Sequence, residues 1–167
     1  MRARGFTLVE VMVVIVVMGI VSSLLILNLS GLDRRKAMQA REVLLLDLKQ
    51  INRLANEQAK VLALEMQSTQ NGTLYRVLEY QPQATALAQK WQAFRVFQPK
   101  TLPMNMRLNI TEIEQVQQSG ALSNDQAPKL MWLGNGEAKP VRIQVYFEEQ
   151  PIGAEIEIDY LGKVHVE

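Results

Sequence analysis

The stretch that decides the fold lies near the N-terminus, where residues 5–27 read GFTLVEVMVVIVVMGIVSSLLIL. Between Phe6 and Leu27, 17 of the 22 residues are apolar and Glu10 is the only charged one. As a helix that rises about 1.5 Å per residue, this segment is about 33 Å long, and the hydrocarbon core of a bilayer is about 30 Å thick. A buried helix of a soluble core usually keeps a polar stripe, and this one has none after Glu10. The segment is therefore expected to span a membrane.

The segment differs from a cleaved secretory signal. Its leader MRARG is basic, as in a signal peptide, but the apolar run is longer than the usual h-region of about 7–15 residues. No A-x-A-like cleavage site follows Leu27, and residues 28–39, NLSGLDRRKAMQ, look like the start of an amphipathic helix. We therefore expect the run to stay attached as an anchor.

Residues 5–10, GFTLVE, closely resemble the N-terminus of type IV pilins and type II secretion pseudopilins. In that family the prepilin peptidase, a membrane aspartyl peptidase, removes a short basic leader just after the glycine and the new terminal residue is N-methylated. The resemblance implies cleavage between Gly5 and Phe6, so that residues 1–5 form the leader and Phe6 is methylated. Glycine suits this position because it has no side chain to obstruct an extended backbone in a protease cleft.

The orientation of the segment depends on the resemblance rather than on charge. The flanking basic residues are Arg2 and Arg4 before it, and Arg34, Arg35, Lys36 and Arg41 after it. By the positive-inside rule this count slightly favours a cytoplasmic C-terminal domain. The short leader of the family stays in the cytoplasm, which implies the opposite: residues 6–27 cross the inner membrane once, and residues 28–167 form a periplasmic domain.

Glu10 needs an explanation because a carboxylate inside a membrane helix is costly. At the centre of the bilayer the cost is about 2.5–3.5 kcal/mol, with less near an end, and such a residue is rarely kept without a partner. In the family this glutamate is thought to pair with the N-terminal amine of a neighbouring subunit, which here implies an attraction between Glu10 and the amine of Phe6. The alternative is a polar residue at the membrane edge, with the span starting at Val11.

Helical periodicity continues beyond the apolar segment. Apolar residues recur at three-to-four spacing at Ala37, Ala40, Leu44, Leu48, Ile51, Ala55, Ala59 and Leu62. Polar residues are assigned to the other faces, namely Arg34, Arg41, Asn52 and Glu57. This predicts one helix from Phe6 to Lys60, amphipathic from about residue 33 to 60, although residues 28–31 could form a short break. The basic run at 34–36 could hold lipid phosphates, but a solvated helical surface is the simpler interpretation.

After Lys60 the pattern changes to the alternation typical of strands. The predicted strands are Leu62–Met66, Leu74–Tyr80, Phe94–Gln98, Met106–Ile110, Leu130–Leu133, Val141–Phe147, Glu155–Tyr160 and Lys163–Val166. Residues 68–72 and 134–136 read as turns, and residues 117–128 as a surface loop. The expected fold is α+β and pilin-like: one long N-terminal helix, with a membrane-spanning first half, packed on antiparallel β-structure over residues 61–167.

The N-terminal motif, the length and the closing pattern I-x-I-x-Y-x-G-K-V-x-V at residues 156–166 together resemble the H-type minor pseudopilins of type II secretion. This implies a structural subunit of a short periplasmic filament that helps to export folded proteins. The implied partners are other major and minor pseudopilins, the prepilin peptidase, the inner-membrane secretion platform and the lipid bilayer. The alternative is a minor type IV pilin of the FimT or FimU kind, involved in pilus assembly or DNA uptake.

Composition argues against an enzyme, a cofactor or a nucleic-acid-binding surface. The chain has no Cys and a single His, and its formal net charge is +1. Residues 28–167 carry 16 basic and 16 acidic residues, which gives no field to attract nucleic acid to the aromatic residues Trp91, Phe94 and Phe97. These aromatics are predicted to pack in the core and at its edge, and His165 to be an exposed strand residue. The acidic residues at 148, 149, 155, 157 and 159 lack the spacing of a calcium loop, so no metal site is expected.

Overall fold

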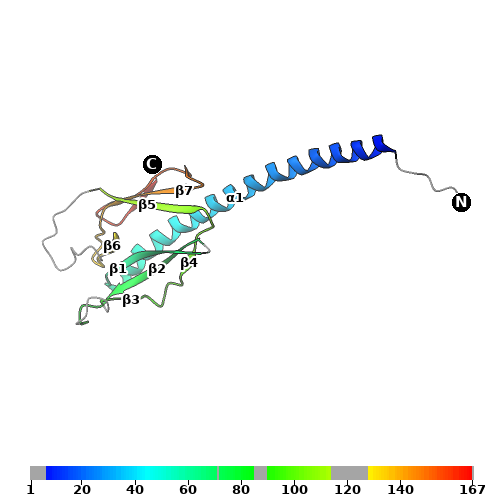
Figure 1. Ribbon diagram of the computed structural model, residues 1–167. Coiled ribbons are helices and arrows are strands. Elements are labelled where there is room, and N and C mark those ends of the chain that lie inside the picture. The colour runs from blue at the N-terminus through cyan, green and yellow to red at the C-terminus, as the bar shows by residue number, and fades with distance from the viewer. Residues whose placement is uncertain (1–6, 71, 85–89, 114–127, 167) are drawn as a thin grey trace. The chain divides into compact units, whose positions relative to one another are not determined.

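The computed structural model describes residues 7–70, 72–84, 90–113 and 128–166, without the side chains of residues 24–31. The chain divides into two compact units, residues 1–36 and residues 37–167. A single helix, α1 (Leu8–Gln58), supplies residues to both units (Figure 1). It is continuous through residues 28–31, so the short break considered there is not realised. The leader and Phe6 lie outside the described residues.

One antiparallel sheet, called sheet A, follows the helix along the chain. Its strands are β1 (Leu62–Thr69), β2 (Gly72–Tyr80), β3 (Trp91–Ala93), β4 (Lys100–Thr101) and β6 (Leu130–Trp132). Their order is β3-β2-β1-β6, and β4 pairs with β2. The β1–β2 hairpin pairs Thr69 with Gly72, which has φ +125°. A Cβ at Gly72 would lie 2.6 Å from the carbonyl oxygen of Leu102, so the hairpin requires glycine there.

The second antiparallel sheet, sheet B, contains most of the C-terminal half. Its strands are β5 (Met106–Glu112), β7 (Val141–Phe147), β8 (Gln150–Pro151), β9 (Ile156–Ile158) and β10 (Val164–Val166). They follow the order β10-β9-β7-β5, with β8 paired to β7. In β7 the side chains of Val141, Ile143, Val145 and Phe147 are buried and the residues between them face outward, as the strict alternation predicts.

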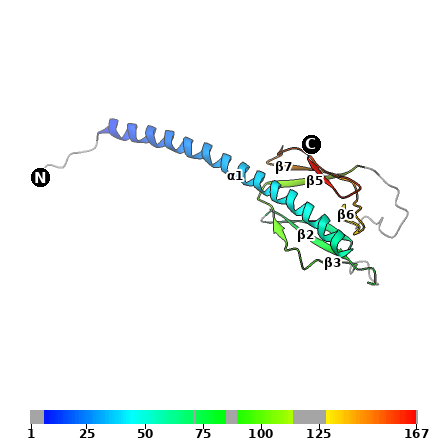
Figure 2. The same cartoon turned by 180° about the vertical axis from the view of Figure 1, so that it is seen from behind.

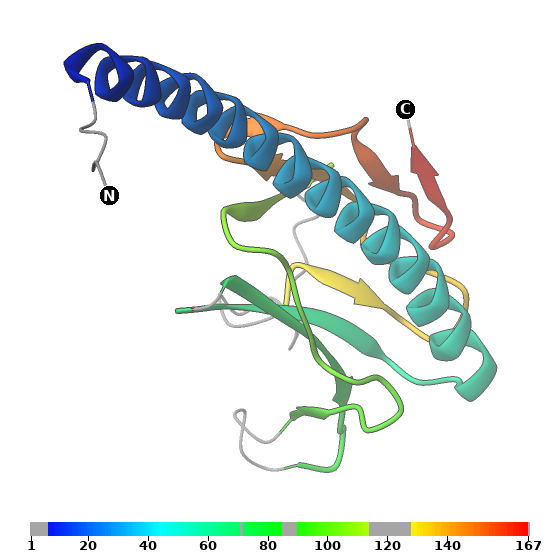
Figure 3. The same ribbon diagram turned by 90° about the vertical axis from the view of Figure 1, so that its right-hand side faces the viewer.

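The core of residues 37–167 lies where α1 meets the two sheets, and residues 37–58 run alongside both of them (Figures 2 and 3). Five helix side chains on one face, separated by three, four or seven residues, are fully buried, namely Ala37, Leu44, Leu48, Ile51 and Ala55. They belong to one hydrophobic cluster with residues from both sheets, including Trp132 and Ile156. The predicted apolar face of the amphipathic helix is therefore confirmed over residues 37–55.

Three expectations about this unit are wrong. Arg41 was assigned to an outer face of the helix, but it is buried. Residues 94–98 form a turn and not a strand, because the N–H of Phe97 donates to the carbonyl of Phe94 at 3.2 Å and both rings turn inward. Ala59 lies past the end of α1, exposed and at φ +49°, instead of on the buried face. Residues 117–127 of the expected loop lie outside the described residues.

Candidate functional site: the N-terminal segment of the helix

Thr7 caps the N-terminus of α1 and explains part of the GFTLVE motif. The backbone N–H of Glu10 donates to the Thr7 side-chain Oγ1 at 3.3 Å and to its carbonyl at 3.1 Å. Thr7 and Glu10 therefore have the S/T-x-x-E spacing of a capping box, in which Glu10 holds the third helical position. A carboxylate there also interacts favourably with the helix dipole. The spacing is visible in the sequence, but Glu10 was interpreted there as a partner for an amine or as a polar residue at the membrane edge, and not as part of a helix cap.

The helix beyond this cap is apolar on every side. From residue 8 to residue 23 all side chains are exposed in the single chain, and the large apolar ones range from 41% exposed at Val14 to 76% at Leu8. An amphipathic surface helix would have one buried apolar stripe, whereas no side chain from residue 8 to residue 23 is buried. Within the part of the chain that the structure describes, we find no helix whose apolar stretch is long enough to cross a membrane.

Glu10 is exposed among these apolar residues. In the described residues its carboxylate has no ion-pair partner, and Gly5 and Phe6, the two residues of the expected cleavage site, lie outside them. The structure therefore brings Thr7 and Glu10 together at the start of α1. It leaves cleavage, methylation and the pairing of Glu10 with a neighbouring amine as predictions.

Asp47 is a buried charge on α1 that the sequence reasoning did not identify. Its carboxylate accepts a hydrogen bond from the Tyr75 hydroxyl at 2.6 Å and two from the Lys100 ammonium at 2.7 and 2.8 Å. Lys100 also lies 5.4 Å from the centre of the Phe97 ring. Burial raises the pKa of the Tyr75 hydroxyl, and the hydrogen bond to Asp47 and the charge of Asp47 raise it further. This cluster fixes β2 and β4 of sheet A to the helix.

Arg41 makes a corresponding contact with the loop between β8 and β9. Its Nη1 lies 2.6 Å from Glu42 Oε1, and its Nη2 donates to the carbonyl of Ala154, in the loop before β9. Gly153 packs directly against the guanidinium: a Cβ there would lie 2.5 Å from Arg41 Nε. A signal for this residue existed, because Arg41 falls four residues after Ala37 and three before Leu44, within the apolar spacing.

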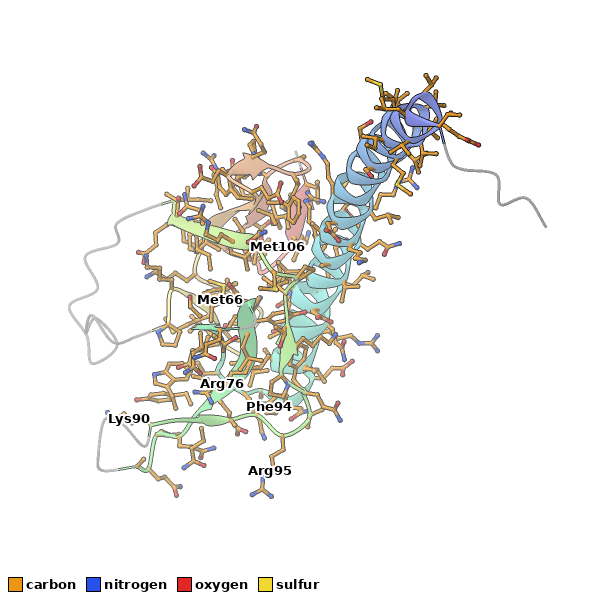
Figure 4. The ribbon with its side chains drawn as sticks, turned by 45° about the vertical axis from the view of Figure 1, so that its right-hand side comes forward. Met66, Arg76, Lys90, Phe94, Arg95 and Met106 are labelled. Carbon is orange, nitrogen blue, oxygen red and sulfur yellow. The ribbon has the colours of Figure 1, made fainter. Side chains whose placement is uncertain are left out.

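The aromatic residues after β2 pack in the interior and at its edge, as predicted. Phe94 and Phe97 are buried, whereas Trp91 is half-buried and meets Tyr80 edge-on with ring centres 5.2 Å apart. Figure 4 shows Arg95, next to Phe94, pointing away from the ribbon. These side chains do not form an open stacking platform.

The C-terminal hairpin is held by Asp159. Its Oδ1 accepts the backbone N–H groups of Leu161 and Lys163, both at 2.9 Å, and its Oδ2 lies 2.9 Å from His165 Nε2. Partial burial acts to raise the pKa of Asp159, but these hydrogen bonds outweigh it, so that the pKa is lowered. His165 is an exposed strand residue, as predicted. In the described ranges no three His, Asp or Glu residues are grouped to hold a metal ion.

Comparison with known proteins gives a match to the N-terminal segment and matches to the fold. Residues 1–26 match the family model described as the prokaryotic N-terminal methylation motif. A solved structure of EpsH, a minor pseudopilin from the type II secretion system of Vibrio cholerae, is 16% identical and superposes with a TM-score of 0.57 over 80% of this chain and 94% of EpsH. A second structure of EpsH gives 15% identity and a TM-score of 0.56, over 78% of this chain and 94% of EpsH.

A search of curated protein sequences gives no significant match. The structural likeness is low in sequence identity and extends over most of both chains, so it establishes the fold of the chain. The N-terminal methylation motif and the α+β pseudopilin fold expected from the residues are both confirmed.

Proposed function

We propose that this chain is an H-type minor pseudopilin, a structural subunit of the filament that helps to export folded proteins by type II secretion. One observation carries the proposal: an N-terminal methylation motif at residues 1–26 occurs on a chain with the fold of a minor pseudopilin. Neither feature is specific alone, because the motif is shared with type IV pilins and the fold is recognised at low identity. The role is structural and involves no catalytic step.

In this proposal the prepilin peptidase cuts between Gly5 and Phe6, and the amine of Phe6 is then methylated. The cut creates a positive charge four residues before Glu10. The carboxylate of Glu10 attracts the amine of Phe6 on an adjacent subunit, and this attraction is strong because the surroundings are apolar. Contact through the apolar surface of residues 11–27 then holds the helices together, and residues 28–167 select neighbouring subunits.

The proposal also assigns a location and partners. Residues 6–27 anchor the subunit in the inner membrane before assembly, with residues 28–167 in the periplasm. The exposed apolar surface of residues 8–23 supports an anchor, because only lipid or other helices can cover a helix that is apolar on all sides. The partners are the other pseudopilins of the filament, the prepilin peptidase and the inner-membrane secretion platform.

Mass spectrometry of the protein extracted from membranes tests the proposal. In cells with an active prepilin peptidase, the expected N-terminal peptide begins at methylated Phe6, and the unprocessed peptide appears when the peptidase is inactivated. A chain that keeps Met1 in cells with active peptidase contradicts the proposal. Co-purification with secretion pseudopilins is expected, and recovery with the subunits of a type IV pilus instead would support the alternative role.

A further inference from the structure

Three consecutive basic residues, Arg34, Arg35 and Lys36, lie on α1 just beyond the apolar segment, and all three are exposed. Lys36 Nζ lies 3.3 Å from Asp33 Oδ1, but both side chains of this pair are more than half exposed, so the contact holds the cation only weakly. Among the described residues, neither Arg34 nor Arg35 has an ion-pair partner. Residues 24–31 include no acidic residue. The positive charge of this group is therefore not neutralised by its own helix.

The spacing of the three residues favours a ligand that surrounds the helix over a partner that contacts one face of it. Successive residues of a helix are about 100° apart around the axis, so residues 34–36 cover about 200° of its circumference. A partner helix or sheet would contact side chains three or four residues apart, along one face. Cations arranged around the axis suit a helix that passes through a layer of anions.

The continuous helix fixes the level of these cations relative to Glu10. Arg34 follows Glu10 by 24 residues, which is about 36 Å along the axis, or about 34 Å along the bilayer normal at a typical tilt of about 20°. The hydrocarbon core is about 30 Å thick and the whole bilayer about 40–45 Å. With Glu10 at one edge of the hydrocarbon, Arg34 lies a few ångströms beyond the other edge, within the phosphate layer.

Cleavage changes the distribution of positive charge on the two sides of the membrane segment. The proposed cut removes Arg2 and Arg4, which leaves the amine of Phe6 on the cytoplasmic side and three exposed cations on the periplasmic side. This is the reverse of the usual distribution around a membrane helix. Anionic headgroups attract basic residues that flank a membrane segment, and such an attraction would offset the reversal.

We propose that Arg34, Arg35 and Lys36 form a basic collar that binds the phosphate groups of anionic phospholipids in the periplasmic leaflet of the membrane. This inference rests on the membrane anchor of the proposed function, with Glu10 at the cytoplasmic edge of the hydrocarbon. The collar holds the waiting subunit at a fixed depth, and extraction into a filament requires these lipid contacts to be released.

The test uses the chain beginning at Phe6, reconstituted into phosphatidylcholine vesicles that contain a trace of spin-labelled lipid. Electron paramagnetic resonance measures how strongly labelled phosphatidylglycerol is held at the protein surface relative to labelled phosphatidylcholine. We expect a preference for phosphatidylglycerol of at least about threefold, which high salt lowers by screening. In the variant Arg34→Gln, Arg35→Gln, Lys36→Gln, the preference is expected to fall to less than about 1.5-fold.

A charge-matched control is the variant Lys49→Gln, Arg53→Gln, Arg95→Gln, which removes three exposed cations from residues 37–167. It is expected to keep the full preference. The collar is refuted by a wild-type chain that shows no preference, by a preference that survives in the collar variant, or by an equal loss in the control. Absent cleavage at Gly5 in cells, by contrast, would refute the proposed function while the lipid preference of the reconstituted chain could persist.

Discussion

At the scale of single residues, the position of Glu10 in the helix cap and the pairing with an amine that we propose for it can be separated by one substitution. Glutamine also serves at the third position of a capping box, so Glu10→Gln keeps the helix start and removes only the charge. We expect cleavage after Gly5 to continue, while recovery of the subunit with other pseudopilins falls at least about tenfold, equivalent to about 1.4 kcal/mol of lost attraction. Affinity purification and immunoblotting of the cleaved subunit measure this recovery.

Thr7→Ala is the matched control for Glu10→Gln, because it removes the side-chain cap and leaves the carboxylate in place. Its recovery is expected to stay within about twofold of the wild type, since loss of a cap costs about 1 kcal/mol of helix stability and no intersubunit charge. If Glu10→Gln assembles normally, or if both variants fail equally, the pairing of Glu10 with a neighbouring amine is wrong.

Tyr75 offers a test of the buried cluster around Asp47. Tyr75→Phe keeps the ring and removes a hydrogen bond to a buried carboxylate, so the free energy of unfolding should fall by about 1.5–3 kcal/mol. Urea unfolding of the detergent-solubilised chain, followed by tryptophan fluorescence, measures the change. The control Tyr80→Phe removes a hydroxyl from a half-buried ring and should cost less than about 0.5 kcal/mol. Equal costs for the two variants would show that the Asp47 contact contributes nothing.

The same hydroxyl predicts a pH dependence. Burial and Asp47 raise the pKa of Tyr75, so the folded chain keeps its proton at a pH where the unfolded chain, with a tyrosine pKa of about 10, releases it. The resulting stabilisation is complete below about pH 10 and is lost as the pH rises further toward the folded-state pKa. Between about pH 10 and 11, the free energy of unfolding should fall more steeply in the wild type than in Tyr75→Phe. Parallel slopes would contradict the raised pKa.

At the scale of elements, the helix and the strands with strong periodicity could be predicted from the sequence, whereas contacts between residues distant in the sequence could not. The long helix and the strand Val141–Phe147 follow from their own spacing. Arg41 and Asp47 fall within the apolar stripe, but their partners Ala154, Tyr75 and Lys100 lie 113, 28 and 53 residues away in the sequence. The two-residue strands β4 and β8 were missed for the same reason, because each is defined only by the strand that it joins.

In the candidate site, too, local features could be predicted from the sequence and contacts with other residues or molecules could not. The GFTLVE motif and the apolar run were recognised because their meaning is local, and the Thr7 cap is local as well. The partner that we propose for Glu10 belongs to a second subunit, and no pattern within one chain specifies that contact. The basic run at residues 34–36 can be placed relative to Glu10 only because the helix is continuous. A break at residues 28–31 would leave the distance between them along the helix axis undefined.

The turn between β6 and β7 provides a prediction at this scale, because two glycines in it have similar backbones and different surroundings. Gly134 has φ +75°, and a Cβ there would lie 2.7 Å from both the N and the O of Lys60 at the end of the helical connection. Gly136 has φ +97°, with nothing within 4 Å. Both alanine variants strain the backbone by about 1–2 kcal/mol, but only Gly134→Ala also displaces main chain.

Gly134→Ala is therefore expected to lower the free energy of unfolding by at least about 2 kcal/mol more than Gly136→Ala, since a backbone contact cannot relax as a flexible side chain can. Thermal and urea unfolding of the two variants measure the difference. Similar values for both would show that the close approach of the turn to Lys60 does not restrict the residue at position 134.

At the scale of the whole molecule, the two compact units have different requirements for stability. Residues 37–167 contain the complete hydrophobic cluster together with the Asp47 and Arg41 contacts, which lie entirely within them. Residues 8–23 contribute exposed apolar surface and no buried side chain. No residue from 8 to 23 belongs to this cluster, and under the proposed function their apolar surface is covered by lipid or by other helices.

This division predicts that a chain starting at Asp33 folds without the apolar segment. Asp33 places an acidic residue at the new helix start, where it interacts favourably with the helix dipole, and Ala37 keeps a helical turn before it. We expect a soluble monomer with native near-ultraviolet circular dichroism, one cooperative urea transition, and a loss from Tyr75→Phe equal to that in the full chain. A fragment without a cooperative transition would show that residues before 33 stabilise the larger unit. Removal of the subunit from the membrane would then lower the stability of residues 37–167.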